Sequence, residues 1–242
     1  MAACLNKRSR QVLVTCEHAG TLVPKAYRTA FHGAGNVVRG HRNHDIGAAD
    51  LAKAIGAACG CPVRLHPYAR LLADVNRSPD SRMVFSDWTR PFPPSRKKAL
   101  LELVYVPYRR RVEDAVKKRM KNGQGILHLS VHTFTPVLDG KKRIADVGLL
   151  YDPSCFLEKG FCRDWRKRLL AEHPQLRVHR NYPYRGVSDG LVAFFRKRFA
   201  ESGYVGIELE VNQAWVSRRR DWDSLKRLLA RTFFETLGRA KD

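Results

Sequence analysis

The stretch GILHLSV at residues 125–131 decides the fold, because it is a short apolar run that ends directly at His132-Thr133. Its length and its branched side chains are typical of a buried β-strand. Three further runs have the same character, namely QVLVT at residues 11–15, DVGLLY at 146–151 and YVGIELEV at 204–211. Residues 62–66 and the LLADV run at 71–75 are expected to add shorter strands.

Helical segments separate these strands. Apolar residues recur at helical spacing in four of them, residues 45–59, 159–172, 191–201 and 221–238. A long basic segment at residues 96–121 is also expected to be helical, with an interruption or kink at Pro107. The alternation predicts a single α/β domain over residues 1–242, whose mixed, mostly parallel sheet is covered by helices on both faces.

Two segments carry the signals of loops. Residues 81–95 contain three prolines, and a loop of that length in a compact domain tends to have a function. Residues 180–190 (RNYPYRGVSDG) are rich in turn-forming residues. This second loop could form a lid through Arg185 and Asp189, or it could be an ordinary surface turn.

The composition is that of a globular protein, with 44% hydrophobic residues. No apolar run approaches the roughly 20 residues that a membrane-spanning helix needs. The basic N-terminus lacks the apolar core of a secretory signal. We therefore expect a cytoplasmic protein with no membrane partner. None of the six cysteines forms a CxxC pair, which favours free thiols over a structural zinc site.

The formal net charge is +22, from 45 Lys and Arg against 23 Asp and Glu. Such a surplus attracts anions, whether nucleic acid, anionic lipid or an acidic substrate. The basic clusters are spread along the chain and lie mostly in the expected helices, which favours solvated helix faces. No nucleic-acid-binding motif is evident, so binding of nucleic acid is kept as an alternative.

Polar side chains gather where the expected strands end. Glu17 and His18 follow the first strand, His132 follows the central one, and Asp45 opens a helix. Ligands of open α/β sheets bind beyond the carboxyl ends of the strands. His18, Asp45 and His132 would supply two imidazoles and one carboxylate, a set that suits a catalytic zinc and leaves a position for water. Asp45 could instead be a helix N-cap, with Glu17 as the competing ligand.

Glu208 and Glu210 lie two residues apart in the last expected strand, so their side chains point to the same face. Two carboxylates at a buried strand end are costly unless a metal or an arginine compensates them. We expect both carboxylates to be catalytic, with Glu210 as the general base that accepts a proton from water in the metal-assisted reaction.

An ordered set of motifs runs from about residue 11 to residue 215: VLVTCEHAGTLVP, HDIGA, YARLLADVNRSP, HTFTP, DVGLLYDP, NYPYRGVSDG and GIELEVNQ. This set resembles the N-formylglutamate amidohydrolase family, in its formylglutamate amidohydrolase-like branch. The resemblance implies a three-layer α/β/α hydrolase fold similar to that of zinc carboxypeptidases. It also implies metal-assisted hydrolysis of N-formyl-L-glutamate to formate and L-glutamate.

The resemblance also suggests roles for individual residues. His18, Asp45 and His132 match the motifs that would hold the metal, expected to be zinc, and Glu210 matches the glutamate of a late Leu-Glu motif. Glu208 stands where better-known members tend to carry glutamine. The expected substrate-binding residues are Arg70, Asn76, Arg77 and Arg185, with Asp74 in the same motif as the first three. A guanidinium can grip a carboxylate of an acidic substrate with two parallel hydrogen bonds.

Two alternatives remain open at this point. The substrate could be a different N-acyl amino acid or a peptide amide, because the chain is shorter and more basic than better-known members of the family. The protein could also be a non-catalytic binder of anions or nucleic acid that keeps the same fold.

Overall fold

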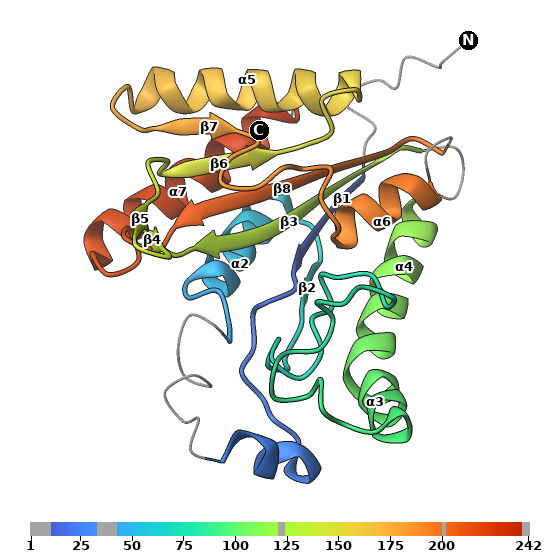
Figure 1. Ribbon diagram of the computed structural model, residues 1–242. Coiled ribbons are helices and arrows are strands. Elements are labelled where there is room, and N and C mark those ends of the chain that lie inside the picture. The colour runs from blue at the N-terminus through green and yellow to red at the C-terminus, as the bar shows by residue number, and fades with distance from the viewer. Residues whose placement is uncertain (1–10, 33–42, 121–123, 200–201, 239–242) are drawn as a thin grey trace.

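The computed structural model describes residues 11–32, 43–120, 124–199 and 202–238, and its centre is a six-stranded sheet (Figure 1). The strands follow the order β2-β1-β3-β8-β6-β7. Their bounds are β1 Gln11–Cys16, β2 Val63–Leu65, β3 Ile126–Phe134, β6 Val147–Leu150, β7 Val178–Arg180 and β8 Tyr204–Asn212. The first four strands in this order are parallel, whereas β6 runs antiparallel to β8 and β7 runs parallel to β6. The predicted mixed, mostly parallel sheet is confirmed.

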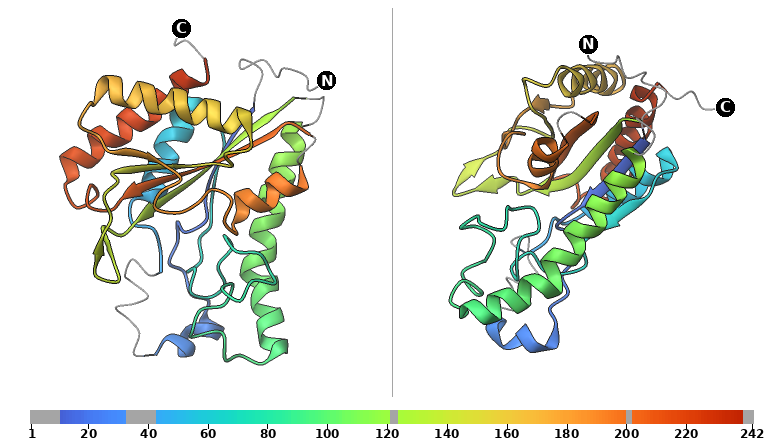
Figure 2. Two further views of the ribbon diagram at one scale, coloured as in Figure 1. Left: turned by 45° about the horizontal axis from the view of Figure 1, so that its top comes forward. Right: turned by 90° about the vertical axis from the view of Figure 1, so that its right-hand side faces the viewer.

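Helices cover both faces of this sheet, which gives the expected three layers (Figures 1 and 2). One face carries α2 Ala48–Cys59, α5 Phe156–Glu172 and α7 Arg219–Thr236. The other face carries α3 Pro94–Leu100, α4 Val106–Met120 and α6 Leu191–Arg198. A 3-10 helix, η2 Lys25–Phe31, and a small hairpin of β4 Val137–Leu138 with β5 Lys141–Lys142 complete the described elements.

The two faces of the sheet differ in polarity because side chains alternate along each strand. On β3, Leu127, Leu129 and Val131 enter the apolar core beneath α2 and α7. The alternate residues of β3 face the other way, and the register pairs Ser130 with Glu208 and His132 with Glu210. This second face therefore becomes polar toward the carboxyl ends of the parallel strands.

The long basic helix is interrupted immediately before Pro107. A π-helical segment, η3 Leu101–Tyr105, joins α3 to α4. Proline has no backbone N–H, and its ring collides with the carbonyl four residues back, here that of Leu103. The widened turn lies where that collision would occur, which confirms the predicted interruption.

The expectation of a strand at residues 71–75 is wrong. This run is irregular and buried, and it lies over the polar face within the apolar cluster that includes α4 and α6. Its carbonyl groups bond to side chains, since the Thr89 hydroxyl donates to Leu72 O at 2.9 Å. Strand β7 and the β4–β5 hairpin were not predicted, because strands of two or three residues are too short to show a periodic pattern.

The described cysteines agree with the composition-based expectation. Cys16, Cys155 and Cys162 are free thiols, and Cys4 lies outside the described residues. Among the described helices, none has the length and apolar character required to span a membrane.

Gly148 on β6 allows the loop after β7 to cross close to the sheet. A Cβ atom at this position would lie 2.0 Å from the carbonyl oxygen of Tyr182 and 3.3 Å from the Cβ of Glu210. The carbonyl belongs to the backbone, so it cannot move aside as a flexible side chain could. The absence of a side chain here is what brings the 180–190 loop beside Glu210.

We predict that Gly148→Ala lowers the free energy of unfolding by about 1–3 kcal/mol, the usual effect of overpacking. Urea denaturation followed by circular dichroism would measure it. Gly160→Ala on α5 is the matched control, because no atom lies within 4 Å of its Cβ and alanine favours a helix. Equal unfolding midpoints for Gly148→Ala and the unmodified protein would contradict the close approach.

Candidate active site

A cavity of about 220 Å³ opens at the carboxyl ends of β1, β3 and β8. Two loops, one around residues 70–77 and one around residues 184–189, form its remaining walls. The lining is almost entirely polar and contains His18, Asp45, Arg70, Asn76, Arg77, His132, Thr133, Tyr184, Arg185, Ser188, Asp189, Glu208 and Glu210. Every residue expected from the sequence to bind metal, catalyse or bind substrate therefore borders one cavity.

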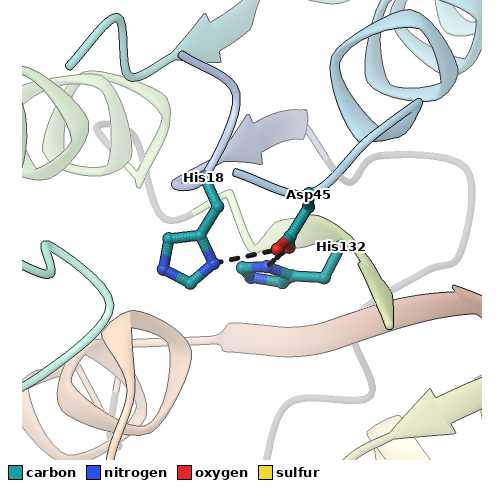
Figure 3. A group of neighbouring side chains, drawn as sticks. All are labelled: His18, Asp45 and His132. Carbon is teal, nitrogen blue, oxygen red and sulfur yellow. Dashed lines mark hydrogen bonds and ion pairs between the residues drawn. The ribbon is translucent and has the colours of Figure 1, made fainter. Parts of the chain in front are cut away.

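His18, Asp45 and His132 converge at the base of this cavity (Figure 3). Asp45 Oδ2 lies 2.8 Å from His132 Nδ1 and 3.4 Å from His18 Nδ1. The two imidazole rings are 4.9 Å apart between centroids, and all three side chains are buried. The donor atoms lie within 4.8 Å of one another, close enough to share one metal ion.

The backbone brings Asp45 to the histidines. The Asp45 N–H donates to the carbonyl of His18 at 2.9 Å, which holds the segment before α2 against the end of β1. Helix α2 begins at Ala48, and its N-cap is Gly47 with φ of 85°. The alternative of Asp45 as the N-cap of this helix is therefore wrong, and its carboxylate is available to the cluster.

Each imidazole uses its second nitrogen to contact a different carboxylate. His18 Nε2 lies 2.7 Å from Asp74 Oδ1, and His132 Nε2 lies 3.1 Å from Glu17 Oε2. Glu17 is completely buried and accepts hydrogen bonds from the Ser130 hydroxyl and from the Tyr108 hydroxyl. It thus contacts the ring nitrogen of His132 that faces away from Asp45.

Charge compensation explains the protonation of this cluster. Burial would raise the pKa of Glu17, but the hydrogen bond and charge of His132 lower it to about 2. Burial likewise opposes ionisation of Asp74, but Arg70 and His18 hold its pKa well below the usual range. Burial also opposes ionisation of Asp45, but His18 and His132 lower its pKa. Burial would lower the pKa of His132, and its bonds to Asp45 and Glu17 raise it instead.

Glu210 and Glu208 line the opposite side of the cavity. Burial raises the pKa of Glu210 to about 8, with His132 opposing the shift and Asp45 and Glu208 adding to it. Burial also raises the pKa of Glu208. Glu210 Oε2 is buried without a hydrogen-bond partner in the described structure. A carboxyl group that gains and loses a proton near neutral pH suits general acid–base catalysis.

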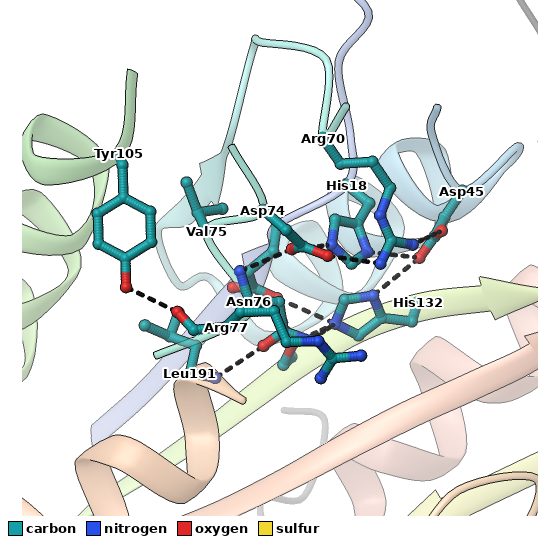
Figure 4. A network of polar contacts seen from close by, with 12 residues as sticks. His18, Asp45, Arg70, Asp74, Val75, Asn76, Arg77, Tyr105, His132 and Leu191 are labelled. Atoms are coloured by element: carbon teal, nitrogen blue, oxygen red, sulfur yellow. Dashed lines mark hydrogen bonds and ion pairs between the residues drawn. The ribbon is translucent and has the colours of Figure 1, made fainter. Parts of the chain in front are cut away.

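The 70–77 segment is held by its own polar side chains (Figure 4). Arg70 Nη2 pairs with Asp74 Oδ2 at 2.6 Å, and Arg70 Nη1 lies 3.8 Å from Asp45 Oδ1. Asn76 Oδ1 accepts the first backbone N–H of α6, that of Leu191, at 2.7 Å. Arg70 and Asn76, both expected to bind substrate, are therefore already bonded to protein groups.

The other two expected substrate-binding residues belong to the cavity mouth. Arg77 donates to the backbone carbonyl of Asp189, which lies in the opposite loop. Arg185 is exposed at the cavity wall, and its guanidinium forms no ion pair or hydrogen bond with any other described residue. Arg185 is consequently the guanidinium most available to an anionic ligand.

The sequence matches the family model of N-formylglutamate amidohydrolase over residues 10–216. The chain belongs to the N-formylglutamate amidohydrolase family. It is accordingly an amidohydrolase-type enzyme, and all the residues that line the cavity fall within the matched range.

Two solved structures share the fold of this family member. The gene product Atu2144 from Agrobacterium tumefaciens superposes with a TM-score of 0.77 at 22% identity, covering 94% of this chain and 90% of that one. The N-formylglutamate amidohydrolase from Ralstonia eutropha JMP134 gives 0.68 at 18% identity, covering 94% and 92%. A search of curated proteins produced no match.

The residues behind the histidines were not predicted from the sequence. Glu17 was expected only as a possible ligand, and Ser130 and Tyr108 had no expected role. Ser130 had a usable signal, because it lies two residues before His132 and must share its face. Tyr108 had none, since it reaches Glu17 from α4 through the tertiary fold.

We predict that Asp189→Ala loosens the 180–190 loop of this enzyme. The Asp189 carboxylate accepts bonds from the Ser78 N–H and hydroxyl, and these bonds tie the two loops together across the cavity. Losing one or two net hydrogen bonds should speed amide hydrogen exchange in the loop roughly 5- to 30-fold.

Asp87→Ala serves as the control, because Asp87 is an exposed aspartate that pairs with Arg90 in a different loop. Its exchange at residues 180–190 should equal that of the unmodified protein. Unchanged exchange in Asp189→Ala would show that the tie does not hold the loop.

Proposed function

We propose that this chain is a metal-dependent amidohydrolase of a small acidic N-acyl amino acid, with N-formyl-L-glutamate as the first candidate. The products would be formate and L-glutamate, and we expect the reaction to occur in the cytoplasm. One observation carries the proposal: three metal-type donor atoms and the unpartnered carboxyl of Glu210 border a single small cavity.

The donor set fits a divalent cation. His18 and His132 both direct Nδ1 toward Asp45, while buried carboxylates contact both Nε2 atoms. Carboxylates in this position orient histidine ligands and increase their basicity. Two nitrogens and one oxygen favour zinc, which when bound would polarise the amide carbonyl and lower the pKa of a water.

Glu210 is the proposed general base and acid. Its carboxylate would take a proton from the attacking water and deliver it to the nitrogen of the departing amino acid as the C–N bond breaks. A pKa raised to about 8 suits both halves of this transfer. Glu208, on the same face two residues earlier, strengthens the hold of Glu210 on the proton through its negative charge.

The cavity supports a small substrate. Its volume of about 220 Å³ is below the range of roughly 300–1,000 Å³ that accommodates drug-sized ligands. Arg185 and Arg77 would bind the substrate carboxylates at the mouth. Arg70 and Asn76 would shape the wall, because their polar groups already hold Asp74 and Leu191.

A panel of N-acyl amino acids tests the substrate directly. N-formyl-glutamate, N-acetyl-glutamate, N-formyl-leucine and a short peptide amide would separate the acyl group from the acidic side chain. Higher kcat/KM for N-formyl-leucine would overturn the acidic specificity and favour a different N-acyl substrate. Absence of turnover with absence of bound metal would favour the non-catalytic binder.

We predict that His132→Ala and His18→Ala each abolish stoichiometric zinc binding and hydrolysis together. Either change removes one of three donors and leaves a buried carboxylate without its imidazole partner. Elemental analysis after dialysis, coupled to a formate-release assay, would measure both. His173→Ala, a histidine outside the cavity, should retain metal and activity. Full activity of chelator-treated His132→Ala would refute the mechanism.

We predict that Glu210→Gln retains zinc but lowers kcat by about 10²–10⁴, the usual contribution of a general acid–base group. The amide keeps the shape of the carboxyl while losing its ability to accept a proton. Glu208→Gln should have the smaller effect on kcat, since Glu208 acts through its charge. Equal losses in the two variants would argue against the assignment of Glu210 as the base.

A further inference from the structure

A second cavity, of about 780 Å³, lies between the edge strand β2 and helix α4. The right-hand view of Figure 2 shows α4 running beside the sheet at the edge where β2 lies. Gln11 and Gln124 line this groove at the amino ends of β1 and β3, whereas the active-site cavity opens at the carboxyl ends. Apart from Tyr108, which contacts both Glu17 and the groove wall, the groove is separate from the catalytic residues.

Four cationic side chains line the groove. Arg111, Lys118 and Arg119 form a stripe along α4 at helical spacing, and Arg64 projects from β2. None of these four cations forms an ion pair with a described carboxylate. Asp114 is the single acidic residue of the lining, and it forms no ion pair with a described cation. Lys117, on the adjacent face of the same helix, does pair with Glu113 at 2.6 Å.

Arg119 shows that these charges are close together and lack compensation. Its Nε is buried without a hydrogen-bond partner in the described structure, although its Nη1 donates to the Ala115 carbonyl. Burial and the neighbouring charge of Arg64 both lower the pKa of the Arg119 guanidinium. Uncompensated cations that lie close together attract anions.

The dimensions favour a polymer over a single small anion. Arg111 and Arg119 are eight residues apart, so they span about 12 Å along the helix axis. A stacked nucleic-acid strand places three to four phosphates over about that length, at roughly 3.4 Å each. The lining also supplies the amides of Gln11 and Gln124, which can donate to phosphate oxygens.

We propose that this groove binds the phosphate backbone of a nucleic-acid strand without reading its sequence. The groove's one aromatic residue, Tyr108, is buried, so no platform is present on which bases could stack. Arginine clusters also bind acidic peptides, so the competing occupant is an acidic polypeptide, for which poly-glutamate serves as the probe in the test below. The net charge of +22 would add a long-range attraction for the negatively charged strand.

The test compares two variants that lose equal charge. Arg111→Ala/Lys118→Ala removes two exposed cations from the groove, and Arg219→Ala/Arg220→Ala removes two exposed cations from the start of α7. Binding of a fluorescent mixed-sequence 20-mer, single-stranded and duplex, would be followed by anisotropy from 50 to 200 mM salt. Amide hydrolysis should be unchanged in both variants.

We expect the groove variant to bind at least 10-fold more weakly at 100 mM salt and to lose about two from the slope of log K against log salt. The Arg219→Ala/Arg220→Ala control should change the affinity and the salt slope only slightly. Equal weakening in both variants would overturn the groove as the site and indicate a diffuse surface effect. Tighter binding of poly-glutamate than of the oligonucleotide, or full competition by millimolar inorganic phosphate, would also overturn the proposal.

Discussion

The structure depends on the compensation of buried charge at the carboxyl ends of three parallel strands. Glu17, Asp45, Asp74 and Glu210 are each less than a tenth exposed and meet in a volume that also holds two imidazoles. Removing an ionised carboxylate from water costs several kcal/mol unless an opposite charge or hydrogen bonds replace the solvent. The register of β1, β3 and β8, the path of residues 70–77 and the packing of α4 all supply such partners.

This constraint explains why the protein has two kinds of carboxylate. Those beside an imidazole or Arg70 have a lowered pKa and serve as fixed negative charges. Glu208 and Glu210 lack a direct cationic partner, so burial raises the pKa of each. Differences in their neighbours alone thus give these carboxylates two roles: some hold the imidazoles in place as fixed charges, and Glu210 can exchange a proton.

Much of this arrangement could be predicted from the sequence, because alternation along strands fixes which side chains share a face. The strands around GILHLSV and YVGIELEV, and the gathering of His18, Asp45 and His132, follow from that rule and from the motifs. The roles of the individual arginines could not be predicted in the same way. Whether a guanidinium serves a protein carboxylate, as Arg70 does, or faces the cavity, as Arg185 does, depends on the direction of a long side chain.

The prediction of a strand at residues 71–75 was wrong for a related reason. Its apolar residues satisfy the pattern of a strand, but their partners come from α4 and α6, which periodicity does not report. Backbone groups there bond to side chains such as Thr89, so burial is achieved without a sheet. Local pattern and tertiary packing diverge most where a loop forms the wall of a site.

The π-helical turn before Pro107 also bears on how this chain could vary over evolutionary time. A π-turn contains one more residue than the α-helical turn it replaces, and such turns are frequent at functional sites. Loss of one residue from Leu101–Tyr105 would restore an α-helical turn and leave the direction of the side chains on α4 nearly unchanged, because the widened turn absorbs the additional residue. Loss of one residue from a regular turn would instead rotate the side chains beyond it by about 100°, given 3.6 residues per turn. A deletion that the widened turn does not absorb would therefore turn Tyr108 away from Glu17 and the cationic stripe away from the groove together, so the phase of a single helix links the inheritance of both sites.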